Sequence, residues 1–403
     1  MREVIIAGYL RTAQSRSRPN EPARDWFYKL RADDLLSKLL PELLRRTGVV
    51  SEEIDDCIIG VSNGVGENWT YGGRLPVFLS NFSERVAAKF VDQQCGSSMA
   101  AIHIGAMEIM LGYADIVIAA GMEHMTRVPM GQAWRKDGHV KLNISLLEQE
   151  KYFHWDIKNA MNMGLTAEKL FSLKNFSRRE LDEWAKRSHD LAVRAQKEGF
   201  FDGEILPIQA EQEDGSVIIV KKDQAVRENV TLEALNELKP AFKENGVITA
   251  GNSSPLNAGA SSILLMSKDR AREKGIKPMA IIRSIGFAGV DPTVMGVGPI
   301  PATKKALKNA GLQVKDIDYW EINEAFTVVV LNCIKELGID PDRVNIKGGG
   351  TAIGHPLGAT GCRLVGTLAR ILNEKKARFG CANACCGGGQ GVATIIEREE
   401  YNW

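Results

Sequence analysis

The chain has 403 residues, and its 51 Lys and Arg residues nearly balance 50 Asp and Glu residues, which gives a formal net charge of +1 at pH 7. This balance gives no electrostatic reason to expect binding to nucleic acid or to an anionic membrane surface. The length allows a large buried core divided among two or three structural units.

The cysteines and the N-terminus indicate a compartment. The seven cysteines are an odd number and lack the spacing of a disulfide framework in a small secreted protein. The first twenty residues run directly into a strand pattern, without the apolar region and cleavage site of a signal peptide. No apolar run approaches the ~18 residues of a membrane helix. These features predict a protein of the reducing cytoplasm.

The first predicted elements are a β-rich segment at 4–12 (VIIAGYLRT) and, within 43–64, a helix end, a glycine stop, an acidic turn and a strand. Next, VDQQCGSSMAAIHIGAMEIMLGYADIVIAAG at 91–121 places Cys95 where a helix should begin. Helix N-termini lower the pKa of a thiol, which makes Cys95 a candidate nucleophile. Backbone N–H groups beside the small residues that follow would face a developing oxyanion. Taken alone, a packed structural cysteine is the simpler interpretation.

Residues 127–250 differ from the segments on either side. They are rich in charge and predict helices and long loops, as in SRRELDEWAKRSHDLAVRAQKEGFFDGEI. Long connecting segments of this kind tend to carry binding surface. We therefore expect an insertion carried on the first half of the chain.

The second half of the chain repeats the first. Gly48 and Asp55, which bracket the acidic turn in the first half, correspond to Gly311 and Asp318 in the second, at a constant offset of 263 residues. The same offset carries Cys95 into another small-residue turn that opens an amphipathic helix, in GTAIGHPLGATGCRLVGTLARIL. The repeat predicts two related α/β halves, each alternating strands and helices around a mostly parallel sheet.

Three stretches of the second half carry chemically useful side chains: EINEAF with Asn323, KGGGTAIGHPLGATG with His355, and CANACCGGGQG with Cys385. Each also has a structural interpretation. An asparagine suits a turn or a cap, and a histidine in a glycine loop suits a hydrogen-bonded structural position. Cys385 with Cys386 suits either an inert core position or a vicinal redox pair.

A metal site and a nucleotide cofactor are both disfavoured. Three cysteines near the C-terminus and His355 supply soft ligands, but their spacing is not the paired C-x-x-C pattern of zinc sites. The glycine loops lack the Gly-Lys-Ser/Thr of a phosphate-binding loop. We therefore expect neither group.

Taken together, these motifs resemble the thiolase family. CGSSMAA, NEAF, GHPLGATG and C-x-GGG-x-G occur in the family's order, and GNSSPLNAGASSILLMS and MGLTAEKL match further stretches, so that the resemblance spans essentially the whole chain. It implies two duplicated βαβαβαββ halves in a five-layered αβαβα sandwich with an inserted loop domain. The N-terminal half would comprise 1–126 with 251–276, the CoA-binding insertion 127–250, and the C-terminal half 277–403.

The resemblance also assigns roles to the motif residues. Cys95 would be the nucleophile that accepts the acyl group, and His355 would activate its thiol. Cys385 would act as the second acid and base, and Asn323 would hold a water molecule in the first oxyanion hole. The backbone N–H groups of Cys95 and Gly387 would form the second oxyanion hole.

Coenzyme A is expected to bind on the insertion and the strand after it. By resemblance, Ser254 of GN-x-S contacts the pantetheine arm, Arg227 ahead of TLE contacts the nucleotide end, and Met163 flanks the acyl group. An ordinary solvated charge is the alternative for Arg227. The resemblance implies no metal or redox cofactor. CoA takes part as a substrate and not as a resident cofactor.

The implied activity is an acyl-CoA:CoA C-acyltransferase, which cleaves 3-oxoacyl-CoA with CoA or runs the reverse Claisen condensation. One covalent intermediate, acyl-Cys95, divides the reaction into two steps and predicts ping-pong kinetics. A homodimer or homotetramer is expected by resemblance, and an accessory subunit stays open. The nearest alternative is a condensing synthase of the same superfamily, which would lack the second catalytic cysteine.

Two departures from the family pattern bear on the acyl group. Asn162 stands where short-chain biosynthetic thiolases carry a histidine, which weakens the case for a specificity for acetoacetyl-CoA. Ser98 stands where glycine is usual in the family. An aromatic cluster in the insertion either lines a pocket for a large or aromatic acyl group or packs under a loop; it consists of Tyr152, Phe153 and Trp155.

Overall fold

The computed structural model describes residues 1–130, 143–153 and 156–400. Its centre is an eleven-stranded sheet in which nine strands follow the order β11-β12-β13-β10-β1-β9-β5-β3-β4, with β2 and β6 attached to β9 and β1. β7 and β8 form a separate two-stranded sheet. The first and second halves of the chain therefore occupy the two ends of one sheet, which join where β1 pairs with β10.

The N-terminal half supplies strands β1 (Val4–Thr12), β2 (Ser15–Arg16), β3 (Asp56–Gly60), β4 (Ala87–Val91), β5 (Ile116–His124) and β9 (Asn257–Ser267). Its helices are α1 (Ala32–Thr47), α2 (Arg74–Leu79), α3 (Ser97–Met110) and α8 (Lys268–Lys274). Every residue of β1, β5 and β9 is buried, because helices cover both faces of this part of the sheet.

The C-terminal half supplies strands β10 (Ala280–Gly289), β11 (Tyr319–Ile322), β12 (Phe379–Cys386) and β13 (Gln390–Glu397). Its helices are α9 (Pro299–Ala310), α10 (Thr327–Leu337), α11 (Gly350–Ile353) and α12 (Leu357–Lys375). The counterpart of β4 is reduced to a single parallel bridge between Trp320 and Val344. Apart from that strand, the half repeats the βαβαβαββ order of the first.

Three apolar clusters define the layers. The first joins α1 to one face of the N-terminal strands, and the third joins α9 and α10 to the outer face of the C-terminal strands. The second lies between them and combines α3 and α12 with residues of both half-sheets. The layers are therefore, in order, α1, the N-terminal strands, the central helices α3 and α12, the C-terminal strands, and the outer helices α9 and α10. These five layers are the predicted αβαβα sandwich.

Equivalent hydrogen bonds in the two halves support the duplication. Gly48 and Gly311 end α1 and α9 with left-handed φ values of 69° and 68°. Asp55 Oδ2 accepts from the first two N–H groups at the start of β5, those of residues 115 and 116 (2.7 and 3.0 Å). Asp318 Oδ2 accepts from the N–H groups of residues 378 and 379 (both 2.9 Å), at the same offset of 263.

The sheet is mixed, so the prediction of a mostly parallel sheet was wrong. Among the named strands of the described chain, parallel pairing occurs between β3 and both β4 and β5, between β11 and β12, and in the short contact of β1 with β6. β9, β10 and β13 pair antiparallel with their long neighbours. β12 and β13 are joined by only three residues, Gly387 to Gly389, and such a short turn requires antiparallel strands.

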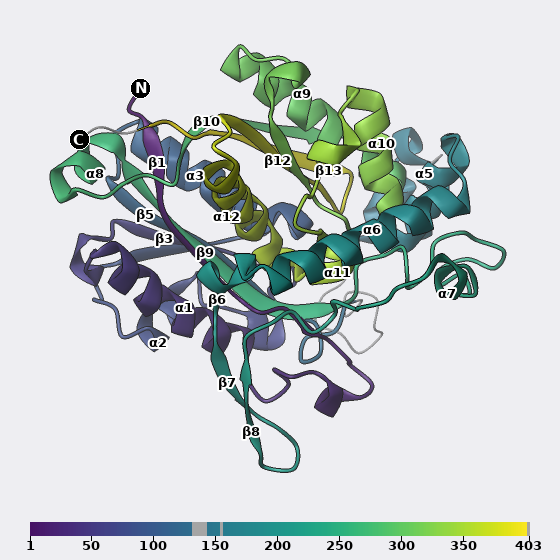
Figure 1. The fold of residues 1–403 in the computed structure, drawn as a ribbon, viewed down its shortest axis with the longest axis horizontal. Coiled ribbons are helices and arrows are strands. Elements are labelled where there is room, and N and C mark those ends of the chain that lie inside the picture. The colour runs from purple at the N-terminus through teal and green to yellow at the C-terminus, as the bar shows by residue number, and fades with distance from the viewer. Residues whose placement is uncertain (131–142, 154–155, 401–403) are drawn as a thin grey trace.

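Part of the insertion covers the C-terminal half, to which it does not belong in sequence, and part packs against the N-terminal half, where β6 pairs with β1. It contains helices α4 (Ile157–Met161), α5 (Met163–Leu173), α6 (Arg178–Lys197) and α7 (Leu232–Asn236), and strands β6 (Ile205–Leu206), β7 (Ile208–Glu211) and β8 (Val217–Val220). α5 and α6 pack beside α10, and α6 also contacts α11, whereas the β7–β8 hairpin projects from the body (Figure 1). The exact division at 127–250 stays a prediction.

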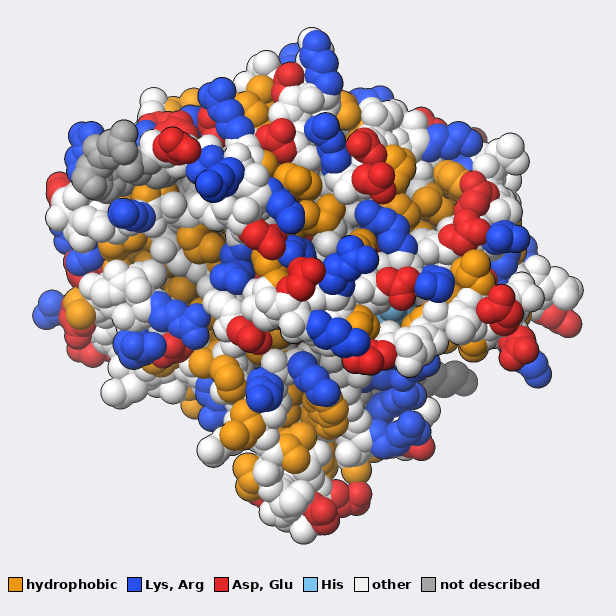
Figure 2. Space-filling model, viewed as in Figure 1, with side chains coloured by type: hydrophobic (Ala, Val, Ile, Leu, Met, Phe, Trp, Pro, Cys, Tyr) orange, Lys and Arg blue, Asp and Glu red, His pale blue; other side chains and the backbone are white. Residues whose placement is uncertain are grey.

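The surface agrees with the near-zero net charge. On the face shown in Figure 2, Lys and Arg side chains are interspersed with Asp and Glu, and no single sign covers a large area. Among the described helices, none is long and apolar enough to cross a membrane.

Candidate active site

Cys95 lies in the turn that opens α3. The 3-10 turn Gln94–Gly96 leads directly into the helix, and Gln94 adopts a left-handed φ of 52°, which is uncommon for a residue with a Cβ. Cys95 is 4% exposed and packs against Met125 and Leu357. Backbone strain next to a candidate nucleophile is typical of sites that fix a reactive atom.

The glycine-rich hairpin turn faces this thiol. Gly388 and Gly389 have φ values of 79° and 75° in the turn between β12 and β13. The backbone N–H groups of the preceding residue, Gly387, and of Cys95 itself lie close enough to the Cys95 sulfur to favour its thiolate form. Gly96 makes the close approach possible, because a Cβ there would lie 2.7 Å from Cys386 Sγ. The two N–H groups predicted for an oxyanion hole therefore converge on the Cys95 sulfur.

Cys385 lies at the end of β12, fully buried and close enough to Cys95 for the two thiols to interact electrostatically. Desolvation raises the pKa of Cys385, and the neighbouring thiols Cys95 and Cys386 raise it further. All seven cysteines of the chain are free and buried. The structure thus brings together the two thiols that sequence predicted for one site.

His355 lies between α11 and α12 with both ring nitrogens engaged. Its backbone N–H donates to Asn257 Oδ1 (2.8 Å), and Nδ1 lies 2.6 Å from Thr360 Oγ1. The Thr360 hydroxyl donates to the Pro356 carbonyl (2.9 Å), so it accepts from His355, which places the proton on Nδ1. Nε2 therefore keeps its lone pair and accepts from Asn323 Nδ2 (3.2 Å).

Burial decides the protonation of both catalytic candidates. Desolvation, followed by repulsion from the nearby Arg363 cation, lowers the pKa of His355 to about 3. Desolvation raises the pKa of Cys95 to about 12, against the opposing effect of the Gly387 N–H. The lowered thiol pKa expected at a helix N-terminus was wrong, because removal from water outweighs it. The resting pair is neutral imidazole and neutral thiol.

Asn323 follows directly after β11 and is fully buried. Its backbone N–H donates to the Asn383 carbonyl of β12 (2.9 Å), and its Nδ2 faces His355. Its Oδ1 has no hydrogen-bond partner among the described residues. A buried acceptor without a protein partner can accept from a bound water molecule.

The residue after Asn323 ties the motif to the insertion. Glu324 accepts from Trp184 Nε1 (2.9 Å) and Ser188 Oγ (2.7 Å) of α6, and from Asn345 Nδ2 (2.7 Å). The NEAF motif in the sequence does not indicate a role for this carboxylate. Its partners lie 21 to 140 residues away along the chain, beyond the reach of any local pattern.

A buried ion pair links the elements that carry His355 and Asn323. Arg363 Nη1 of α12 donates to Glu321 Oε2 of β11 (2.8 Å), and both side chains are fully buried. Desolvation raises the pKa of Glu321 to about 8, and the Arg363 charge opposes that shift. Sequence analysis missed both residues.

The predicted CoA contacts lie around this core. Ser254 is half-buried and its backbone N–H donates to the carbonyl of Ala325, two residues after Asn323. Met163 is half-buried at the start of α5, against the outer cluster of the C-terminal half. Arg227 is exposed, and its backbone N–H donates to His189 Nδ1 (3.2 Å).

The departures from the family pattern have structural roles. Ser98 is buried and its hydroxyl accepts from the backbone N–H of Cys362 (3.0 Å), which joins α3 to α12. Asn162 is exposed and caps α5 by accepting from the Leu165 N–H. In the aromatic cluster, Phe153 is exposed, and Trp155 lies outside the described residues.

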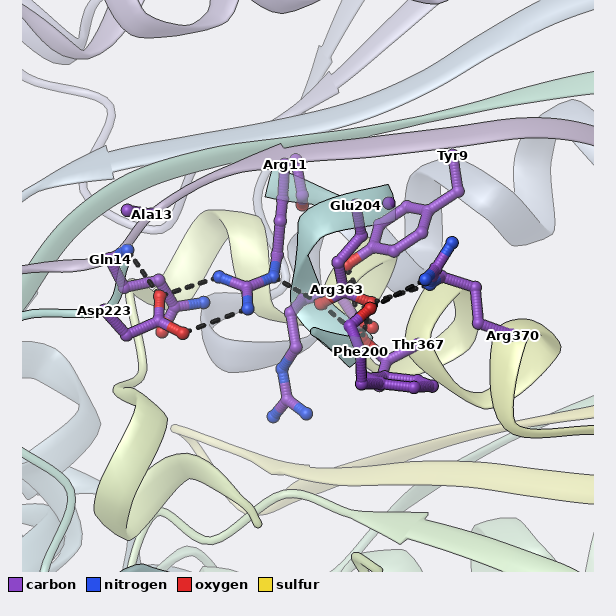
Figure 3. Close-up of polar contacts among 12 residues, drawn as sticks. Tyr9, Arg11, Ala13, Gln14, Phe200, Glu204, Asp223, Arg363, Thr367 and Arg370 are labelled. Atoms are coloured by element: carbon purple, nitrogen blue, oxygen red, sulfur yellow. Dashed lines mark hydrogen bonds and ion pairs between the residues drawn. The ribbon is translucent and has the colours of Figure 1, made fainter. Parts of the chain in front are cut away.

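A buried charge network anchors the N-terminal strand next to the site (Figure 3). Arg11 Nε donates to Glu204 (2.6 Å), and Nη1 and Nη2 donate to the two carboxylate oxygens of Asp223 (2.7 and 3.0 Å). The Gln14 backbone N–H also donates to Asp223 (2.8 Å). Arg11 therefore fixes the chain that follows β8. In the described part of the chain, no group of three or more His, Cys, Asp or Glu side chains is placed to hold a metal ion.

Comparisons with known proteins agree with this arrangement. A family model described as the N-terminal domain of thiolase matches residues 5–269, and one described as the C-terminal domain matches residues 276–398. The chain is 40% identical over 402 residues to a 3-ketoacyl-CoA thiolase of Marinobacter nauticus, covering 98% of each protein. It is 40% identical over 375 residues to a probable acetyl-CoA acyltransferase of Staphylococcus aureus, covering 92% of this chain and 94% of the relative.

Solved structures give the same result. A human mitochondrial 3-ketoacyl-CoA thiolase superposes with a TM-score of 0.86 at 30% identity and 99% coverage of both chains. A Bacillus anthracis acetyl-CoA acetyltransferase superposes with a TM-score of 0.85 at 35% identity, covering 98% of this chain and 99% of the other. These matches confirm the resemblance that the motifs indicated: the chain belongs to the thiolase family.

Proposed function

We propose that this thiolase cleaves 3-oxoacyl-CoA with CoA, or runs the reverse condensation, through an acyl-Cys95 thioester. The proposal rests on two neighbouring buried thiols, Cys95 and Cys385, and on the His355 imidazole, whose Nε2 is free of a proton and which lies two residues before Leu357, a packing partner of Cys95. Carbon–carbon cleavage next to a thioester needs a nucleophile for the 3-oxo carbon and a separate acid for the departing carbon. The two thiols fill these roles.

In the first step, His355 Nε2 takes the Cys95 proton and the thiolate attacks the 3-oxo carbon. The N–H groups of Cys95 and Gly387 stabilise the oxygen that becomes negative. The C2–C3 bond then breaks, which leaves an acyl-Cys95 thioester and the enolate of acetyl-CoA. Cys385 protonates the enolate carbon, while His355 and a water molecule held by Asn323 stabilise its oxygen.

In the second step, the Cys385 thiolate takes the thiol proton of an incoming CoA. The CoA sulfur attacks the acyl-Cys95 thioester, acyl-CoA leaves, and the Cys95 thiolate recovers its proton from His355. All protons are thereby returned. A thioester intermediate preserves the acyl-transfer potential of CoA, and exclusion of water protects it from hydrolysis.

The neutral resting state fits this cycle. Because the pKa of Cys95 is raised and that of His355 is lowered, an ion pair between them is disfavoured until a substrate occupies the site. The acyl-enzyme carries no charge on Cys95, so burial imposes no comparable penalty on it. Burial therefore favours acylated Cys95 over the free thiolate.

Intact mass measurement tests the proposal. The protein is mixed with acetoacetyl-CoA, a medium-chain 3-oxoacyl-CoA, and aromatic and dicarboxylic analogues, and the adduct is located by peptide mapping. An acyl group on Cys95 is expected, and its mass names the acyl group accepted. Turnover without an adduct on Cys95, or with an adduct elsewhere, contradicts the proposed nucleophile.

We also propose that the chain forms a homodimer across the free edge of β4. This strand ends the sheet, and exposed aromatic side chains lie just before it, among them Trp69, Tyr71 and Phe78. Free edges and exposed apolar patches favour association. Light scattering should give a dimer for the wild type and a monomer for Tyr71→Glu with Phe78→Glu, whereas Val217→Glu on the exposed hairpin should leave the dimer intact.

The reducing cytoplasm remains the proposed location, which suits a chain with seven free thiols. The purified chain alone is expected to be active. Activity that appears only after a second protein is added would instead assign an accessory subunit.

A further inference from the structure

Three arginines near the active site have no acidic partner. Among the described residues, Arg16, Arg18 and Arg227 form no ion pair, although most Lys and Arg side chains around them do. Arg24, the fourth cation of this region, is exposed and bonded to Glu21 (2.7 Å). Unpaired arginines are ordinary on an open surface, but Arg16 and Arg18 are half-buried.

One amide side chain holds the arginine-bearing segments together. Gln224 Oε1 accepts from the backbone N–H groups of Arg16 (2.8 Å) and Trp26 (3.3 Å), and its Nε2 donates to the Arg24 carbonyl (2.8 Å). Gln224 follows Asp223, which Arg11 fixes to the end of β1 (Figure 3). The hydrogen bonds of Asp223 and Gln224 therefore hold in place the backbone segments that carry Arg16, Arg18 and Arg227.

A buried carboxylate in the same segment, Asp25, does not neutralise these arginines. Asp25 is fully buried and accepts from the hydroxyls of Ser15, Ser17 and Thr126, and from the Phe27 N–H. All four donors are neutral, so the carboxylate organises the loop and forms no ion pair with any arginine. Among the described residues, no carboxylate therefore pairs with Arg16, Arg18 or Arg227 to balance their positive charge.

The cluster lies beside the predicted path of the substrate. The Ser15 carbonyl accepts from Asn257 Nδ2 (2.8 Å), and the other end of that carboxamide holds the His355 backbone. The Ser17 N–H donates to the carbonyl of Leu256 (2.8 Å), two residues after Ser254. Arg16 and Arg18 thus flank the strand segment on which the pantetheine arm is proposed to lie.

The positive charges of these arginines repel one another. Desolvation, followed by repulsion from Arg18, Arg227 and Arg24, lowers the pKa of Arg16 to about 10. A half-buried cation among other cations is unfavourable unless a ligand supplies negative charge. Guanidinium groups bind phosphate oxygens through paired N–H donors, which matches the most anionic part of CoA.

We infer that Arg16 and Arg18, together with Arg227, bind the phosphate groups of the CoA nucleotide, an assignment that rests on the proposed function. The family resemblance predicts only Arg227 at the nucleotide end. The two further arginines make recognition depend on the phosphates as well as on the pantetheine arm. The diphosphate and the 3′-phosphate share this chemistry, and dephospho-CoA, which lacks only the latter, separates them.

The test compares substrates with and without the nucleotide. For Arg16→Gln and Arg18→Gln, the ratio of kcat/KM for the 3-oxoacyl-CoA that the wild type cleaves to that for the corresponding 3-oxoacyl-pantetheine should fall by roughly tenfold each, the usual scale of one charged contact. Arg16→Lys keeps the charge and should recover part of the loss. Arg45→Gln, an exposed arginine on α1 bonded to Glu42, is the matched control and should leave the ratio unchanged.

Binding of CoA, dephospho-CoA and pantetheine, measured by calorimetry, gives a readout independent of turnover. A loss of CoA affinity that is absent with dephospho-CoA assigns the 3′-phosphate, and a loss shared by both assigns the diphosphate. Equal losses with all three ligands, or no loss with any, overturn the inference. Wild-type protein that binds CoA through these arginines but cleaves no 3-oxoacyl-CoA contradicts the proposed function and leaves the phosphate site standing.

Discussion

The two halves of the molecule place equivalent helices, α3 and α12, side by side at the centre but use the turns before them differently. The first turn carries Cys95, with the Gly387 N–H directed at its sulfur. The position 263 residues later is Gly358, where a Cβ would lie 2.3 Å from the Met122 carbonyl oxygen. The duplicated fold thus sets where the helices begin, and the chemistry depends on a few residues in each turn.

Substitution at these two equivalent positions should separate chemistry from packing, with the largest effect expected. Cys95→Ala should lower kcat/KM by at least about 10⁴-fold, because the covalent step is lost, while the melting temperature stays near that of the wild type. Gly358→Ala should instead destabilise the fold by about 1–3 kcal/mol or more, since the added methyl meets backbone. Cleavage assays and thermal unfolding check both. Equal loss of stability in the two variants would contradict the assignment of a chemical role to Cys95 and a packing role to Gly358.

In the proposed mechanism, the second turn contributes to the reaction through the tautomer of His355. Thr360→Val removes the hydroxyl that accepts from Nδ1, so the imidazole loses both its orientation and its fixed proton. We expect kcat to fall roughly 10- to 100-fold, the scale of misplaced catalytic groups. Thr360→Ser keeps the hydroxyl and should restore most of the rate. A Thr360→Val enzyme with wild-type kcat would show that another group sets the tautomer.

A carboxylate that joins the loop after β3 to the start of α12 should make stability depend on pH. Glu123 is buried and accepts from the N–H groups of Ser62 (2.9 Å) and Gly358 (3.0 Å). Desolvation, against these hydrogen bonds, raises the pKa of Glu123 to about 7. Because the folded pKa lies above the unfolded value, the folded state binds the extra proton, and this stabilisation is complete below about pH 4 and lost as pH rises through about 7.

The magnitude is at most about 3 kcal/mol, since one pKa unit corresponds to ~1.4 kcal/mol. Glu123→Gln keeps a neutral acceptor and should flatten the dependence of unfolding free energy on pH between about 4.5 and 7. Denaturant unfolding at several pH values measures this. An unchanged slope in the variant would assign the titration to another group.

The smallest effects should come from the most similar pair of residues. Asp55→Asn and Asp318→Asn each weaken two hydrogen bonds to the first N–H groups of a strand, β5 or β12. Each should cost about 1–2 kcal/mol of unfolding free energy. Equal losses of unfolding free energy in the two variants would show that the equivalent aspartates contribute equally to stability. A large difference would show that the two halves share a backbone geometry but not the energy of these hydrogen bonds.

Sequence was sufficient for features carried by contiguous motifs. The nucleophile turn, the His355 loop, the glycine hairpin and the 263-residue repeat each occupy a short stretch, so that their residue types indicated their places. The repeat even marked Asp55 and Asp318, whose hydrogen bonds the structure shows to be equivalent.

Sequence failed where distant segments and solvent decide the result. The raised pKa of Cys95 follows from burial by Met125 and Leu357, which no local motif encodes. Strand direction was also hidden, because alternation of strands and helices does not report the antiparallel return of β9 and β13. The Glu324 and Arg363 contacts depend on partners from other elements, and nothing in their neighbours marks these charges as buried.

The central claim is that two thiols divide the reaction, and one experiment tests it directly. Cys385→Ala is mixed with acyl-CoA and, separately, with the 3-oxoacyl-CoA that the wild type cleaves, and rapid quenching is followed by intact mass measurement. We predict that the variant takes an acyl group from acyl-CoA onto Cys95 but does not cleave the 3-oxoacyl-CoA. Cleavage at the wild-type rate would show that Cys385 is not the second acid and would contradict the mechanism.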